Sequence, residues 1–184
     1  MNKLVSILAV TILLTFTGFN YNAQNTEWKI VTSSVSFKIK NAGFTTDGKF
    51  GALTGTIIFD AAKSYSNSID VSVDSKAINT GNGTRDVHLK KKEYFDIDTY
   101  PKINMKGASF AKAKDGTFKG YFKLTLKGKT KDVVVPFSFT EKDGKGLFKG
   151  AFTIDRLDYG VGENSMVLSD NATITIEVNV IKKQ

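Results

Sequence analysis

The chain has 184 residues, of which 41% are hydrophobic, and it carries a formal net charge of +8 at pH 7. It has no cysteine and one histidine, which excludes disulfide bonds, a thiol nucleophile and a zinc site built from cysteine and histidine. The positive charge comes almost wholly from lysine, with Arg85 and Arg156 as the two arginines, so a solvated lysine-rich exterior is favoured over phosphate recognition. Contact with an anionic membrane surface remains open.

Residues 1–23 are predicted to be a cleaved signal peptide. Lys3 supplies the positive start, Leu4 to Phe16 is an uncharged apolar stretch, and small residues lead out near Ala23. The alternative is a short membrane anchor, but the apolar run is below the roughly 18 residues of a spanning helix. We therefore expect a periplasmic or secreted protein, without a lipidated cysteine, whose single domain comprises residues 24–184.

Eight segments alternate apolar and polar residues with a period of two, as half-buried antiparallel strands do. Trp28 and Ile30 have the opposite phase to the first of them, which predicts a bulge between Ile30 and Ser33. In chain order, the inward positions are Val35, Phe37, Ile39; Leu53, Ile57, Phe59; Ile69, Val71, Val73; Ile103, Met105; Phe118, Phe122, Leu124, Leu126; Val133, Val135, Phe137, Phe139; Phe148, Phe152, Ile154; and Ile174, Ile176, Val178, Val180.

Short glycine-containing links between these segments predict hairpins, at Asp115-Gly116, Lys127-Gly128 and Asp143-Gly144. Strands joined in sequence by tight turns favour a meander that closes into an all-β, eight-stranded antiparallel barrel. A two-sheet sandwich is the alternative, but it would need longer crossovers. Pro136 lies within a strand and cannot donate to the ladder, so we expect a seam or an irregular edge beside it.

The exception to the β pattern is Thr80–Ile103, which predicts one short helical crossover that caps a mouth of the barrel. Asn82 or Thr84 is a suitable N-cap, and the helix is expected to run to about Phe95 before Pro101 ends the excursion. So short a helix must dock an apolar side on the barrel. That side is predicted to contain Val87 and Leu89, with the lysines 90–92 in solvent.

Three polar residues stand out against this apolar pattern. Arg156 shares the inward phase of its strand, and a buried guanidinium needs a carboxylate partner or an anionic ligand group. Asp155, Asp158 and Asp86 are the nearby carboxylates that could pair with it. The same two interpretations apply to Arg85, whereas His88 is predicted to be a packed, hydrogen-bonded residue.

The sequence resembles the YceI-like family of exported lipid-binding or polyisoprenoid-binding proteins. The motifs that carry the resemblance follow one another over nearly the whole mature chain: V-S-F-K-I-K-N-A-G-F at 35–44, G-x-L-T-G-T-I-I-F-D at 51–60, T-G-N-G-T-R-D-V-H-L-K-K-K-E-Y-F-D at 80–96 with Y-P-K-I after it, L-T-L-K-G-K-T-K at 124–131 and I-D-R-L-D-Y-G-V-G at 154–162. One departure is Ser33, where the family often has a histidine.

The resemblance implies a lipocalin-like barrel whose cavity holds a long isoprenoid, isoprenoid quinone or fatty chain. Twelve of the 14 phenylalanines lie outside the predicted signal peptide and agree with an apolar interior, and Gly107, Ser109 and Gly120 in inward phases would leave room for a ligand. A solid core fits the same pattern. The residues expected to line a cavity are Phe37, Phe59, Val71, Leu89, Phe95, Met105, Phe122, Leu124, Phe137 and Phe152, with Arg85, His88 and Arg156 at its polar end.

Other functions are less well supported by the residues. An enzyme would have to use His88, yet Asp86 faces elsewhere on the helix and no nucleophile-elbow motif occurs. Export and the scarcity of arginine argue against a nucleic-acid-binding barrel. A structural or adhesive surface domain with a solid core is the remaining alternative. We expect no cofactor and no metal, with a lipid as ligand, and the sequence predicts no oligomeric state.

Overall fold

The computed structural model describes residues 26–183, so the predicted signal peptide lies outside the described residues. Within this range no helix is long and apolar enough to cross a membrane. The strands and the one α-helix found there are β1 (Glu27–Asn41), β2 (Phe44–Lys49), β3 (Thr54–Ile58), β4 (Ser68–Asp74), α1 (Gly83–Leu89), β5 (Lys102–Lys112), β6 (Phe118–Leu126), β7 (Lys129–Lys142), β8 (Lys145–Asp155) and β9 (Leu168–Lys182). Three short 3-10 helices, η1 (Ser64–Ser66), η2 (Ser75–Ala77) and η3 (Leu157–Tyr159), lie in the connections.

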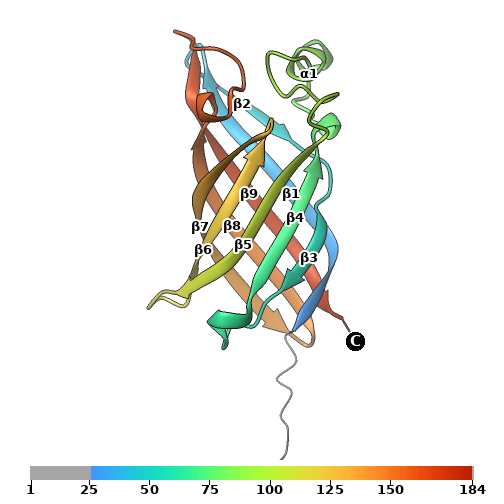
Figure 1. Cartoon of the computed structure of the whole chain (residues 1–184), viewed down its shortest axis with the longest axis vertical. Helices are drawn as coiled ribbons and strands as arrows, with labels where there is room; N and C mark the ends of the chain where they lie inside the picture. The colour runs from blue at the N-terminus through green and yellow to red at the C-terminus, as the bar shows by residue number, and fades with distance from the viewer. Residues whose placement is uncertain (1–25, 184) are drawn as a thin grey trace, which may run out of the picture.

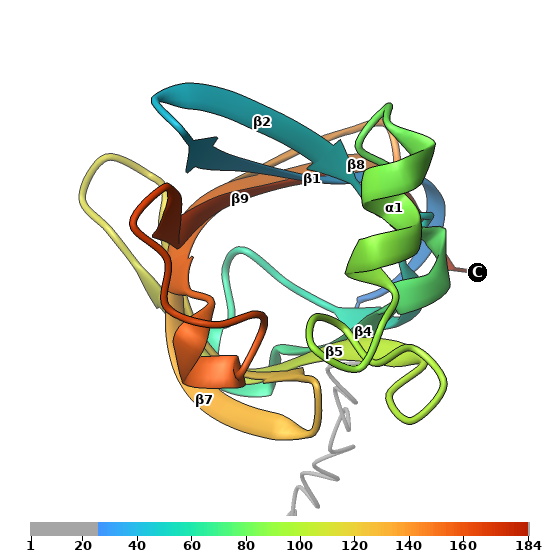
Figure 2. The same cartoon turned by 90° about the horizontal axis from the view of Figure 1, so that it is seen from above.

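Eight of these strands, β1 and β3 to β9, pair in chain order with antiparallel neighbours. The ring closes because β9 pairs back onto β1, from Trp28 opposite Lys182 to Asn41 opposite Leu168. The barrel is seen side-on in Figure 1, with α1 at its upper end, and end-on in Figure 2. We call the end that carries α1 the helix end. The predicted eight-stranded antiparallel barrel is confirmed.

A ninth strand, β2, was not predicted. It pairs with β1 beside the ring, from Asn41 opposite Phe44 to Ser36 opposite Lys49, after a turn whose two residues, Ala42 and Gly43, both have positive φ. Toward the opposite end β1 pairs instead with β3, at Glu27 and Trp28. The same edge of β1 therefore has β2 as its neighbour at the helix end and β3 at the other end.

Local irregularities in the strand pairing change the directions in which side chains point. The predicted bulge in β1 is confirmed by a register shift between Ile30 and Thr32. The expected seam is confirmed too, because the β7–β8 ladder ends at Phe137, directly beside Pro136. A shift between Gly107 and Ser109 in β5, which was not predicted, leaves Ser109 exposed, so its predicted inward phase is wrong.

The end of the barrel away from α1 is filled by an aromatic core. Phe59 is 0% exposed and lies at its centre. The rings packed around it have centroids 5.1–5.8 Å away and meet it mostly edge to face: Phe110, Phe118, Phe137, Phe139 and Phe148. The indole Nε1 of Trp28 donates a 2.8 Å hydrogen bond to the Phe59 carbonyl, which ties β1 to the end of β3.

Two inward glycines serve this core and do not enlarge a cavity, contrary to the sequence-based expectation. A Cβ atom on Gly107 would lie 2.5 Å from the ring of Phe122, and one on Gly120 would overlap the same ring. Both positions therefore have to be small so that Phe122 can lie across the barrel wall. The space that they leave is already occupied.

The crossover helix is shorter than predicted. Its N-cap is Asn82, whose side chain accepts a 3.0 Å hydrogen bond from the Arg85 N–H. The helix ends at Leu89 and not near Phe95, because the chain then folds back and the Phe95 N–H donates to the Leu89 carbonyl. Val87 is 61% exposed, so only the Leu89 part of the predicted apolar side faces the barrel.

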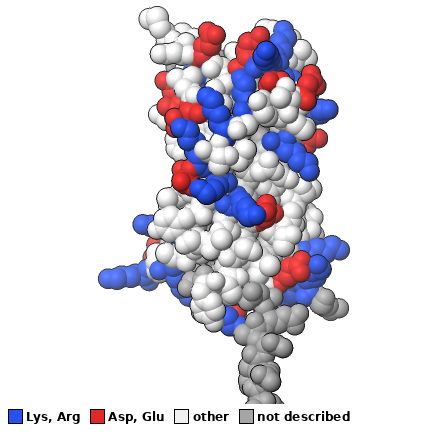
Figure 3. All heavy atoms as spheres, viewed as in Figure 1, with Lys and Arg blue, Asp and Glu red and all other residues white. Residues whose placement is uncertain are grey.

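The outer surface of the barrel carries charges of both signs (Figure 3). Cross-strand ion pairs such as Lys106 with Asp70 and Lys123 with Asp132 lie on this exterior, with partner atoms 3.2 and 2.8 Å apart. On the face in Figure 3, basic side chains are interspersed with acidic ones. This arrangement agrees with a solvated exterior.

Candidate functional site: a cavity at the helix end

The helix end of the barrel encloses an open-mouthed cavity of about 460 Å³. Its wall comes from inward side chains of β1, β4, β5, β6, β8 and β9, and α1 with the segment after it covers part of the mouth. The wall is mostly aliphatic or aromatic, and polar groups concentrate where the lining reaches α1 and the residues before it. Such a volume and lining suit one slender apolar ligand with a polar end.

Seven of the ten residues predicted to line a cavity do border this one: Phe37, Val71, Leu89, Phe95, Met105, Leu124 and Phe152. The other three, Phe59, Phe122 and Phe137, are buried in the core below it, where aromatic rings and not a cavity surround them. Inward phase alone assigns a side chain to the interior. It does not say at which height along the barrel the interior is filled.

Phe50 also borders the cavity and was not predicted. It follows β2, and its ring lies 5.7 Å from that of Phe37 on one side and 5.7 Å from that of Phe95 on the other. Phe50 thereby connects the barrel wall to the segment after α1. No periodic pattern marks Phe50, because it lies in the connection that follows the unpredicted strand.

The segment after α1 is anchored to two loops. The ammonium group of Lys127, in the β6–β7 turn, donates to the carbonyls of Glu93 and Gly160 at 3.1 and 2.6 Å. Glu93 O also accepts a 2.8 Å bond from the Gly162 N–H. Burial, as the largest effect, lowers the pKa of Lys127. These contacts hold Tyr94 and Phe95 over the cavity.

Arg85 lies at the mouth and is oriented by Thr80. Its Nε donates to the Thr80 hydroxyl at 2.8 Å and one terminal nitrogen donates to the Thr80 carbonyl at 2.9 Å. Asp86 accepts from the N–H and the hydroxyl of the same threonine, at 2.9 and 2.6 Å. The Thr80 hydroxyl, followed by its N–H and by Arg85, lowers the pKa of Asp86 despite an opposing desolvation effect.

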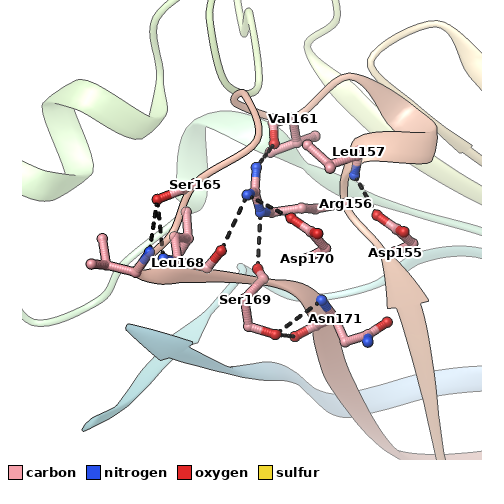
Figure 4. Close-up of polar contacts among 10 residues, drawn as sticks. Asp155, Arg156, Leu157, Val161, Ser165, Leu168, Ser169, Asp170 and Asn171 are labelled. Carbon is pink, nitrogen blue, oxygen red and sulfur yellow. Dashed lines mark hydrogen bonds and ion pairs between the residues drawn. The ribbon is translucent and has the colours of Figure 1, made fainter. Parts of the chain in front are cut away.

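Arg156 is buried, at 4% exposure, and its carboxylate partner is Asp170, with 2.9 Å between the atoms. It also donates to the carbonyls of Ser169, Val161 and Leu168 (Figure 4). The sequence-based alternatives of Asp155, Asp158 and Asp86 are all wrong. Those carboxylates are engaged with Leu157, Lys131 and Thr80 respectively. Arg156 borders the cavity, but its charge is already compensated by the protein.

A family model described as the YceI-like domain matches residues 28–180. The chain belongs to the YceI-like family. It is 30% identical over 134 residues to a UPF0312 protein of Pseudomonas savastanoi pv. phaseolicola, an alignment that covers 69% of this chain and 70% of the relative.

Solved structures of YceI-like barrels agree with the fold. The crystal structure of Burkholderia cenocepacia BcnA has a TM-score of 0.76 at 26% identity, covering 80% of this chain and 95% of BcnA. A structure described as a polyisoprenoid binding domain from Saccharophagus degradans has a TM-score of 0.66 at 15% identity, covering 86% and 99% of the two chains. At that identity the second likeness shows the fold alone.

In this YceI-like chain His88 is exposed on α1 and borders the cavity mouth, so the prediction of a packed histidine is wrong. Among residues 26–183, no three histidine, aspartate or glutamate side chains gather in a group that could hold a metal ion. The mouth offers hydrogen-bonding side chains to a ligand, among them Arg85 and His88.

Proposed function

We propose that this protein is an exported carrier or binding protein that holds a long-chain apolar lipid in the barrel cavity. The ligand class comprises isoprenoids, isoprenoid quinones and fatty-acid derivatives. The observation that carries the proposal is the mostly apolar, open-mouthed cavity at the helix end, with polar groups concentrated toward α1 and the residues before it. The polyisoprenoid-binding description of the Saccharophagus degradans domain, which has the same fold, adds support.

The tail of the ligand would lie among the wall residues, and its polar end would meet Arg85 and His88 at the mouth. Arg85 is the better candidate for contact, because Thr80 orients its guanidinium without neutralising its charge. Arg156 was expected at the polar end as well. Its ion pair with Asp170 and its three carbonyl acceptors favour a structural role in supporting the wall.

Export to the periplasm or beyond is part of the proposal and rests on the signal-peptide pattern of residues 1–23. A carrier that leaves the cytoplasm has to exchange its lipid with a membrane, so we include transient contact with an anionic membrane surface. Phe44 on β2 and Met166 and Val167 before β9 are exposed apolar side chains near the mouth. The Ala42 N–H bonds the Val167 carbonyl at 2.7 Å, which brings these loops together.

The main alternative, a structural or adhesive domain with a solid core, is less well supported because only one end of the barrel is solid. Catalysis is not part of the proposal. Asp86 is engaged with Thr80, so the carboxylate nearest to His88 in sequence is directed away from a role as its partner.

Extraction of the protein from its own cells tests the proposal directly. We expect native mass spectrometry of the purified protein to show a bound mass that organic extraction releases as a single-chain lipid. The variant Phe95→Asp, which puts a charge over the cavity, should lose this mass, whereas Tyr121→Asp on the outer face should keep it. Repeated isolation of protein without any lipid would contradict the proposal.

A further inference from the structure

Cross-strand layers define where the cavity ends. Val71, Met105 and Leu124 lie opposite one another on β4, β5 and β6, and all three border the cavity. One step further from α1, the next inward layer on the same strands consists of Ile69, Gly107 and Phe122, and none of these borders it. The floor of the cavity therefore lies between these two layers.

Phe122 supplies most of the material in that floor layer. Its ring lies against Gly107 on β5 and Gly120 on β6, both without side chains, and it is 4% exposed. The ring of Phe110 meets it edge to face at 5.7 Å, and Phe110 continues into the aromatic core around Phe59. A tail that reaches past the layer of Val71, Met105 and Leu124 would thus meet one aromatic ring backed by a solid core.

We infer that Phe122 is the stop that sets the length of the hydrophobic tail. This inference rests on the proposed function and narrows its ligand class. The preferred ligand is a single-chain lipid whose tail fits between the mouth at Arg85 and the ring of Phe122. A tail that needs the full height of the barrel is disfavoured, because it would have to displace the aromatic core.

Because of the two glycines, the size of the Phe122 side chain should determine how deep the cavity is and how long a tail it accepts. If its side chain is shortened, neither Gly107 nor Gly120 can extend into the space that it vacates. A shorter side chain there should consequently deepen the cavity. Conversely, a longer ring at Leu124, one layer nearer the mouth and already facing the cavity, should raise the floor.

Chain-length profiles test the inference. The dissociation constants of the full-length mature protein would be measured for a homologous series of saturated fatty acids and a series of linear isoprenoid alcohols. While the tail still gains contacts, each added methylene should tighten binding by about fourfold, and beyond the stop the gain should cease. Phe122→Leu should move this break to longer chains, and Leu124→Phe should move it to shorter ones.

Phe148→Leu is the control, since Phe148 lies in the aromatic core against Phe59 and away from the cavity. It should leave the break unchanged. If the wild-type protein binds the lipids but the chain length at which the gain ceases is the same in Phe122→Leu and in Leu124→Phe as in the wild type, the assignment of Phe122 as the stop is wrong. Absence of binding by the wild-type protein to every member of both series would instead contradict the proposed function itself.

Discussion

The two arginines of the chain differ in how their charges are compensated. Arg156 is buried and its guanidinium bonds Asp170 and three carbonyls, whereas Arg85 is half-buried at the mouth and its guanidinium bonds only Thr80 among the described residues. Removing the buried guanidinium of Arg156 would leave Asp170 and the three carbonyl acceptors without their donor. The Arg85 guanidinium is accessible to solvent and bonds only neutral groups of Thr80, so its removal leaves no buried charge without a partner.

The same substitution at the two arginines should therefore affect different properties, namely stability at Arg156 and lipid retention at Arg85. Arg156→Gln should lower the free energy of unfolding by about 3 kcal/mol, as urea titration would measure. Arg85→Gln should change stability by less than about 1 kcal/mol and reduce lipid retention. Full stability in Arg156→Gln combined with loss of lipid would reverse these assignments and return Arg156 to the head-group site.

Tyr159 should make the free energy of unfolding depend on pH in the alkaline range. It is 1% exposed in η3, and burial, with a smaller effect of Asp158, raises its pKa to about 12. Between the unfolded pKa of about 10 and this value, the unfolded chain has lost the proton that the folded chain still holds. The free energy of unfolding should therefore fall as pH rises through this window.

Urea unfolding at about pH 9 and about pH 11 measures this effect, with Tyr159→Phe as the matched variant. The wild type should lose roughly 1 kcal/mol more than Tyr159→Phe over that interval. Equal losses in the two proteins would mean that Tyr159 does not contribute to the alkaline instability.

At the scale of residues, the sequence predicts most of the side chains that lie inside but not what they contact. Arg156 was correctly placed inward by its phase, yet its partner Asp170 was missed. That aspartate lies across the β8–β9 connection, and its approach depends on the β8–β9 register and on the path of η3. Neither the register nor that path can be read from strand periodicity.

At the scale of elements, α1 and the segment after it cover part of the cavity mouth, and one side of α1 faces the cavity. Leu89 borders the cavity, whereas Val87, two residues earlier on the same helix, is largely exposed. Leu89→Asp should loosen the cover and lower lipid retention by about tenfold, because a carboxylate would have to be buried against apolar wall residues.

Val87→Asp is the matched control for this prediction, since it adds the same charge to the same helix at an exposed position. It should leave retention unchanged. Retention would be measured as the rate at which bound lipid transfers to acceptor vesicles. Equal rates for the two variants would contradict the assignment of α1 as a cover.

Element prediction succeeded where turn chemistry was explicit. Lys127-Gly128 and Asp143-Gly144 form the expected hairpin turns with positive φ at both residues. β2 was missed because its turn begins with Ala42, a residue type that rarely adopts positive φ, and so no turn was recognised there. Because β2 was not predicted, Phe50 and the part of the cavity wall beside it were not predicted either.

At the scale of the whole molecule, the aromatic core and the proposed binding cavity are separated along the barrel axis. The aromatic core occupies one end and the cavity the other. Phe59→Ala should lower the free energy of unfolding by about 4 kcal/mol, since it opens a void among five rings. Phe95→Ala should cost less, because Phe95 is only half-buried, and should weaken lipid binding more.

Paired measurements of urea unfolding and lipid retention on these two variants test the separation. Parallel losses of stability and retention in both would contradict it. The sequence alone could not predict the separation, because inward phenylalanines occur along the whole barrel. Their packing into one end depends on heights fixed by the register, as Phe122 and Leu124 on one strand illustrate.

The most direct test of the central claim is a crystal structure of the protein purified from its own cells. A carrier of a single-chain lipid predicts continuous elongated density that starts beside Arg85 and ends above the ring of Phe122. A cavity that contains only ordered water in such crystals, or that is filled by repacked side chains, would contradict the account.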